Sequence, residues 1–101
     1  MHGKYLKIWK YSHIIKEVDM PTIAIIYGVR IGMRLRQKEH NPPHIHVYYD
    51  NLAASFSIID CEKLGGGVPR KQTQIIINFI KEHRDELLEM WNTQNFHKIG
   101  G

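Results

Sequence analysis

The sequence predicts a two-layer α+β domain, in which one long C-terminal helix covers an antiparallel meander of about four strands. Between residues 22 and 59, apolar or alternating segments are separated by turn residues, which is typical of short strands. Between residues 69 and 91, apolar side chains recur at helical spacing. The chain has 101 residues, enough for one core, so we divide it into an N-terminal extension, 1–19, and a single domain, 20–101.

Four segments show the strand patterns. TIAIIY, residues 22–27, is apolar and β-branched, as expected of a buried strand. VRIGMRLR, residues 29–36, alternates strictly between apolar and polar side chains, and HIHVYYD, residues 44–50, alternates in the same way. LAASFSII, residues 52–59, is predicted as the fourth strand. QKEHNPP, residues 37–43, is predicted as a turn, because its double proline excludes helix and cannot lie inside a central ladder.

The residues after the fourth strand are predicted to form a loop and then the helix. DCEKLGGGV, residues 60–68, contains three consecutive glycines, which we interpret as a flexible connection. Pro69 favours the start of a helix. The apolar stripe of this helix consists of Ile76, Ile80, His83, Leu87 and Trp91. We interpret His83 as a hydrogen-bonded core residue and Trp91 as core, and we expect residues 92–101 to fray.

Composition favours an ordinary cytoplasmic protein. Apolar residues make up 43% of the chain and charged residues 24%, so disorder is not expected. No apolar run approaches the roughly 18–20 residues needed to cross a bilayer. The N-terminus contains lysines but no continuous apolar stretch, so we expect no signal peptide. Cys61 is the only cysteine, so it cannot form an internal disulfide, and we interpret it as a passive thiol in a reducing compartment.

The positive charge lies in the first half of the chain. The formal net charge is +4, and residues 51–101 contain as many acidic as basic side chains. The excess therefore surrounds HNPPHIHV, residues 40–47, which holds three of the seven histidines. A basic region of this kind indicates an anionic partner such as RNA, a nucleotide or an acidic protein. The alternative is that a small excess of lysine only improves solubility.

The two alternating segments can be paired as a hairpin. If both apolar faces are buried, their polar faces must also point to one side. A turn over residues 37–43 pairs Arg36 with His44, Arg34 with His46, Gly32 with Tyr48 and Arg30 with Asp50. The predicted solvent-facing side then carries Arg30, Arg34, Arg36, His44, His46 and Tyr48. Side chains that are directly opposed in such a pair lie about 4.5–5.5 Å apart.

The histidine spacing allows a metal site as one interpretation. His44 and His46 resemble the His-x-His ligand pair of cupins, and His40 adds a third candidate ligand. The predicted neighbours argue against a cation, because guanidinium groups repel a divalent metal. We therefore expect no cofactor, and we keep a divalent metal bound by these three histidines as an alternative.

The same neighbours favour an anion. Arg30, Arg34 and Arg36 can bind phosphate oxygens, and the Tyr48 hydroxyl adds a donor. With an RNA phosphate, His44 and His46 become candidates for general acid and base, because imidazole titrates near neutral pH. Arg34 and Arg36 would stabilise the charge on the phosphate, which is the chemistry of a metal-independent ribonuclease. Anion binding without catalysis and purely structural histidines are the alternatives.

Several motifs resemble a bacterial family of small domains of unknown function. They are MPTI, HNPPHIHV and the helix segment HRDELLEMW, and they extend from Met20 to Trp91. Members of that family are often encoded in two-gene units that look like toxin–antitoxin modules. The resemblance implies a cytoplasmic bacterial protein with a small protein partner and an RNA-directed toxin activity. It names no catalytic residues, although its signature positions are His40, Asn41, Pro42, Pro43, His44 and His46. Exposed sheet edges also make a homodimer an expectation.

Overall fold

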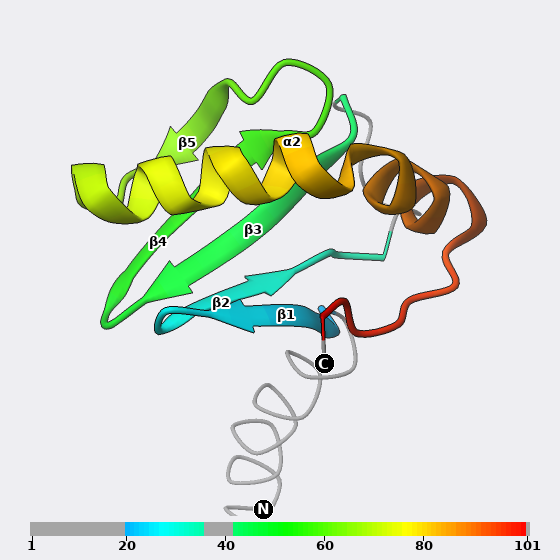
Figure 1. Ribbon diagram of the computed structural model, residues 1–101, viewed down its shortest axis with the longest axis horizontal. Coiled ribbons are helices and arrows are strands. Elements are labelled where there is room, and N and C mark those ends of the chain that lie inside the picture. Colours follow the sequence, from blue (N-terminus) through cyan, green and yellow to red (C-terminus); the bar gives the residue numbers. More distant parts are fainter. Residues whose placement is uncertain (1–19, 36–41, 101) are drawn as a thin grey trace, which may run out of the picture.

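The computed structural model describes residues 20–35 and 42–100, which form one sheet and one long helix. The strands are β1 (Thr22–Ile26), β2 (Val29–Gly32), β3 (His44–Tyr49), β4 (Leu52–Ser57) and β5 (Lys63–Gly66), and the helix is α2 (Arg70–Thr93). The strands pair antiparallel in the order β1-β2-β3-β4-β5, and α2 lies across one face of the sheet (Figure 1). The predicted α+β fold is therefore confirmed, with one strand more than expected.

The β2–β3 pair has the predicted parity but a different register. Arg30 lies opposite Tyr48, and Gly32 lies opposite His46. The predicted pairing of Arg34 with His46 is therefore wrong by two residues. A shift of two residues leaves every side chain on the same face of the sheet, because the side-chain period of a strand is two. The hydrophobic pattern cannot distinguish these two registers.

The core lies between the sheet and α2. Alternating residues of β2 and β3, such as Ile31 and Val47, are fully buried on this face. Ile76, Ile80 and Leu87 of α2 cover them and are fully buried as well. Burial of such side chains is the main stabilising contribution, about 1.5–3 kcal/mol for each large aliphatic residue. Of the described helices, none is long and apolar enough to span a membrane.

Helix α2 bends at His83. This residue has φ −121° and ψ 21°, which are not helical values. The side chain of His83 is 27% exposed, so the prediction of a core histidine is wrong. Its ring lies 4.7 Å from that of Phe79. Beyond the bend, the helix turns toward the end of the sheet where β3 begins (Figure 1). The bend therefore brings Trp91, which is 5% exposed as predicted for a core residue, to that end of the sheet.

Residues Lys63–Gly66 form the edge strand β5, so the prediction of a loop over residues 60–68 is wrong for these four residues. Gly66 has φ +68°. A Cβ on this glycine would overlap the carbonyl oxygen of Ala53 and would lie 2.8 Å from Ala54 Cα. The amide of Gly67 donates to that same carbonyl at 2.9 Å. The glycines therefore allow a close backbone approach to β4, which strand propensity does not predict.

Residues 94–100 return to the sheet, so the prediction of a frayed tail is wrong. Ile99 is 9% exposed, and its amide donates to the carbonyl of Ile23 at 2.7 Å. His97 Nε2 lies 2.6 Å from Glu86 Oε2, which connects the tail to α2. The burial of Ile99, its backbone bond to β1 and the polar contacts with α2 order this segment, although it has no periodic pattern.

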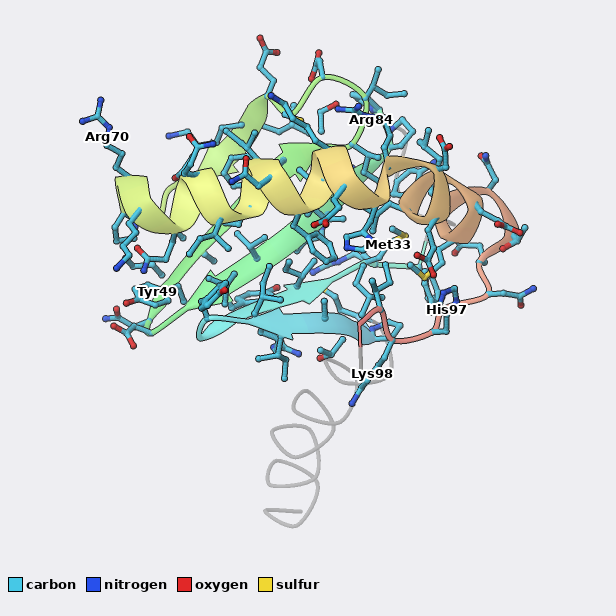
Figure 2. The ribbon with its side chains drawn as sticks, viewed as in Figure 1. Met33, Tyr49, Arg70, Arg84, His97 and Lys98 are labelled. Atoms are coloured by element: carbon cyan, nitrogen blue, oxygen red, sulfur yellow. The ribbon has the colours of Figure 1, made fainter. Side chains whose placement is uncertain are left out.

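Arg84 connects α2 to the loop between β4 and β5. Figure 2 labels the side chain of Arg84 on this helix. Its Nε donates to the carbonyl of Ile58 at 2.8 Å, and its Nη2 lies 3.3 Å from Cys61 Sγ. Cys61 has φ +64°, a conformation that is uncommon outside glycine. The guanidinium thus holds a tight loop against the helix, which gives Arg84 and Cys61 structural roles.

We predict that Gly66→Ala destabilises the domain by about 2–4 kcal/mol, because the new Cβ overlaps backbone atoms and the positive φ is strained. Urea denaturation measures the difference. Gly28→Ala is the matched control: its φ is +79°, but the nearest atom to a Cβ is 3.7 Å away. That variant should lose only about 1 kcal/mol. Equal losses in both variants would show that the close approach to β4 is unimportant.

Candidate functional site

The face of the sheet opposite the part of α2 that precedes its bend at His83, which we call the open face, carries the polar side chains of β2 and β3. Arg30, Gly32, His44, His46 and Tyr48 belong to it, because their neighbours in sequence point into the core. Across β4 and β5 the same face continues with small residues, namely Ala53, Ser55, Ser57 and Gly65. The predicted gathering of basic and imidazole side chains on one face is thus present among the described residues.

Arg30 and Tyr48 form a fixed pair on the open face. The guanidinium carbon of Arg30 lies 4.8 Å from the centroid of the Tyr48 ring, a cation–π geometry. Arg30 Nη1 also donates to Thr22 Oγ1 at 2.7 Å, and both Arg30 and Tyr48 are half-buried. The predicted partner of Arg30 was Asp50, whereas the strand pairing gives it Tyr48. Arg30 therefore holds a positive charge in a defined orientation beside a tyrosine.

His46, His44 and Trp91 form a row of rings at the beginning of β3. The ring centroids of His44 and His46 are 4.9 Å apart in an edge-on arrangement. On its other side, the His44 ring lies 5.2 Å from that of Trp91. His44 is 4% exposed, whereas His46 is half-buried. The expectation that both histidines face solvent is therefore wrong for His44, because the end of α2 covers it.

The hydrogen bond of His44 defines its tautomer. His44 Nδ1 lies 2.8 Å from the carbonyl oxygen of Pro42. A carbonyl oxygen only accepts, so Nδ1 must carry the proton. In the neutral ring the basic nitrogen is then Nε2. The double proline thus orients the imidazole as well as forming the turn.

Arg34 has a buried donor. Its Nε has no hydrogen-bond partner among the described residues. Met33 is in the core, so alternation places Arg34 on the open face. Extending the β2–β3 register by two residues beyond Gly32 would bring Arg34 opposite His44. A buried donor without a partner costs about 1–3 kcal/mol, and more when it is charged, so an anion at this position would be stabilised.

Met20 also belongs to the site, although the chemistry of its side chain gave no reason to predict this from the sequence. It is 1% exposed and lies on the open face, where its sulfur accepts a hydrogen bond from the Tyr48 hydroxyl at 3.3 Å. A Cβ on Gly32 would lie 3.0 Å from Met20 Cγ. The absence of a side chain on Gly32 therefore makes room for Met20. The Met-Pro-Thr motif was the signal, although it carried no information on where Met20 packs.

Two predicted site residues, Arg36 and His40, lie outside the described residues. The metal alternative that includes His40 therefore stays a prediction. Within residues 20–35 and 42–100, no group of three or more histidine, cysteine, aspartate or glutamate residues is arranged to hold a metal ion. His44 and His46 alone would supply two ligands.

These features define a small α+β domain with a basic, histidine-bearing sheet face. A family model described as Domain of unknown function (DUF4160) matches residues 28–92. The match covers more than half of the chain, so the chain belongs to this family. It includes the His40–Val47 octapeptide and the His83–Trp91 helix segment, both of which carried the resemblance. Neither the search of curated proteins nor the search of solved structures found a match.

We predict that His44→Ala destabilises the domain by about 2 kcal/mol, because it removes a buried ring between two aromatic neighbours and a hydrogen bond. His46→Ala is the matched comparison and should cost less than about 1 kcal/mol, since this ring is only half-buried. Thermal denaturation of both variants measures the difference. The reverse order of stability would contradict a structural role for His44.

Proposed function

We propose that this protein is a component of a bacterial toxin–antitoxin-like module and that it binds RNA phosphates through the open face. The observation that carries the proposal is the buried Arg34 Nε, which has no partner among the described residues. It lies on the same face as Arg30, His46 and Tyr48. A phosphate oxygen accepts hydrogen bonds from guanidinium groups with good geometry.

The shape of the open face supports this ligand. The cation–π contact with Tyr48 and the hydrogen bond to Thr22 hold Arg30 in place, so binding an anion costs little further ordering. Ala53, Ser55 and Gly65 lie across the sheet from Tyr48 and His46. Ala53 is exposed and Ser55 and Gly65 are half-buried, so this part of the open face is accessible to a ligand. This arrangement favours single-stranded RNA, whose backbone can follow a shallow surface.

The ribonuclease version of the proposal assigns different roles to the two histidines. His46 is the less buried of the two histidines, although its Nε2 atom is itself buried, so we assign it the role of candidate proton-transfer group. His44 is 4% exposed and its Nδ1 is bound to Pro42, so we assign it the role of positioning the His46 ring. Arg34 would stabilise the charge that develops on the phosphate, with Arg36 as the further candidate named from sequence.

A second candidate function is a non-catalytic module that binds a cognate protein. The two-gene context of the resembled family favours such a partner in the cytoplasm. The contacts of His44 with Trp91 and Pro42 favour it as well, because they show that one of the two histidines has a structural role. This alternative predicts no RNA cleavage by the purified protein.

A metal protein is the third candidate function. Elemental analysis of protein purified without an affinity tag tests it, because the absence of near-stoichiometric bound metal would exclude this function.

We predict that Arg30→Gln combined with Arg34→Gln weakens binding of a fluorescein-labelled oligouridylate at least tenfold at low salt. Each phosphate contact that is lost should reduce the salt slope of log K by about 0.7. Fluorescence anisotropy over a salt series measures both quantities. Arg70→Gln combined with Lys71→Gln is the matched control, because it removes equal charge from exposed positions at the start of α2. If the control loses as much affinity, binding reflects net charge and the open face is not the site.

For the ribonuclease version, we predict that His46→Asn abolishes RNA cleavage and growth inhibition. The same variant should bind the oligouridylate within about threefold of the wild type, because the arginines supply most of the affinity. Gel analysis of labelled RNA in the presence of EDTA measures cleavage without metal. Unchanged cleavage after His44→Ala and His46→Ala together would rule out catalysis by these histidines.

A further inference from the structure

We propose that the outer edge of β1, together with an apolar groove between β1 and α2, binds an extended strand of a partner protein. The partner strand would carry an aliphatic side chain for the groove and basic residues beside it. This site lies on another part of the molecule from Arg34 and His46, and the proposal does not depend on RNA binding.

The backbone of β1 directs hydrogen-bonding groups away from the sheet. Tyr27 and Gly28 form the turn between β1 and β2, and Ile26 pairs with Val29. In such a two-residue hairpin the pair that flanks the turn is hydrogen-bonded, so the amide and carbonyl of Ile25 point outward. Ile25 is 65% exposed, and among the described residues no backbone group bonds to it at this edge.

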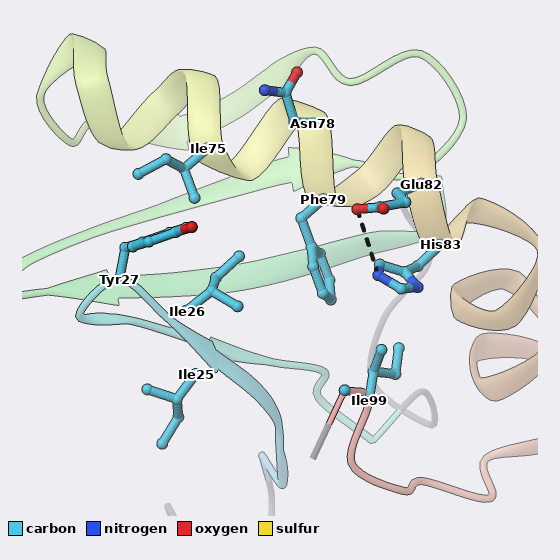
Figure 3. Close-up of a pocket in the computed structure, with 10 residues that line it drawn as sticks. Ile25, Ile26, Tyr27, Ile75, Asn78, Phe79, Glu82, His83 and Ile99 are labelled. Carbon is cyan, nitrogen blue, oxygen red and sulfur yellow. Dashed lines mark ion pairs between the residues drawn. The ribbon is translucent and has the colours of Figure 1, made fainter.

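A groove lies directly beside this edge. It has a volume of about 260 Å³ and runs between β1 and the first half of α2. Figure 3 shows the side chains of Ile26, Phe79 and Ile99 directed into it, with Ile75 above them. An open strand edge next to an apolar groove is the combination used in recognition by strand addition, where the backbone supplies hydrogen bonds and alternate side chains enter pockets.

The tail of the chain, residues 94–100, already binds to one end of the β1 edge and fills part of the groove. The amide of Ile99 donates to the outward carbonyl of Ile23 at 2.7 Å, and the side chain of Ile99 enters the groove. The tail therefore occupies the Ile23 end of the edge. The end at Ile25 and Tyr27 is exposed, with Tyr27 84% accessible. A partner strand can continue along this edge from the point where the tail is bonded, using the same type of contact.

The charge of the groove indicates which strand fits. The described residues that line it include one carboxylate, Glu82, and no lysine or arginine. Glu82 is 75% exposed and lies 3.8 Å from His83. In a chain with a net charge of +4, the groove therefore lacks the basic side chains found elsewhere, and its described lining residues carry one carboxylate beside one histidine. It favours basic residues on the partner and disfavours nucleic acid.

A second copy of this chain is a poorer occupant of the edge. Antiparallel pairing of two β1 strands about Ile25 would place Tyr27 of one copy opposite Ile23 of the other. The carbonyl of Ile23 is not available for this pairing, because it already accepts a hydrogen bond from the amide of Ile99. Both tails would have to be displaced before the two strands could pair. A short strand from a different protein meets no such obstacle.

The experiment uses the full chain and a short fluorescein-labelled peptide of alternating threonine and valine with lysines at both ends. We expect saturable binding by anisotropy and slower hydrogen exchange of the Ile25 amide. Glu82→Lys should weaken binding about tenfold, which corresponds to about 1.4 kcal/mol. Ile25→Pro, which removes the outward amide, should weaken it at least as much. Glu89→Lys makes the same charge change at an exposed position outside the groove and should bind like the wild type.

Three results would overturn the proposal. The first is the absence of saturable binding, and the second is equal binding of a peptide with glutamates in place of its lysines. The third is a peptide-free dimer in sedimentation that Ile25→Pro converts to monomer, which would assign the edge to a second copy. If Ile25→Pro does not fold, Glu82→Lys and the exchange of the Ile25 amide still decide the question. None of these measurements involves RNA, so they are separable from failure of the open-face proposal.

Discussion

The contact between His44 and Trp91 joins the beginning of β3 to the end of α2, and the arrangement of the site depends on it. The rings are 5.2 Å apart, and both are almost fully buried. Trp91 reaches this position because α2 bends at His83, which directs the last turns of the helix toward the end of the sheet. The same His44 is oriented by Pro42 through its Nδ1. One buried imidazole thus connects the double-proline turn, the central strand and the helix.

This constraint separates two histidines that look equivalent in the sequence. His44 and His46 are two residues apart, and both were candidate proton-transfer groups. The covering tryptophan buries His44, whereas His46 lies further along β3, between Gly32 of β2 and Ser55 of β4. A ligand on the open face would therefore meet His46 and the two arginines. The structural role of one histidine and the candidate functional role of the other are compatible.

The two surfaces proposed as binding sites differ in charge and in the element that builds them. The open face carries Arg30 and Arg34 and suits an anion. The groove beside β1 carries Glu82 and apolar side chains and suits a strand with basic residues. Because the two surfaces are separate, substitutions can abolish binding at one of them without changing the other.

Several parts of the fold were predictable from the sequence, because local patterns determine them. Alternation in the sequence predicted which face the described side chains of β2 and β3 occupy, and the helical stripe predicted the burial of Ile76, Ile80, Leu87 and Trp91. The β2–β3 register was not predictable, since a shift of two residues leaves the alternation unchanged.

The remaining differences come from contacts between distant segments. The close approach of Gly66 to Ala53, the return of Ile99 to Ile23 and the covering of His44 by Trp91 each join residues far apart in the chain. The sequence by itself determined the fold class and the gathering of arginine and histidine on one sheet face, because both follow from periodicity. Only the tertiary structure decided which histidine is buried and where the strand edge stays open, because packing between layers sets both.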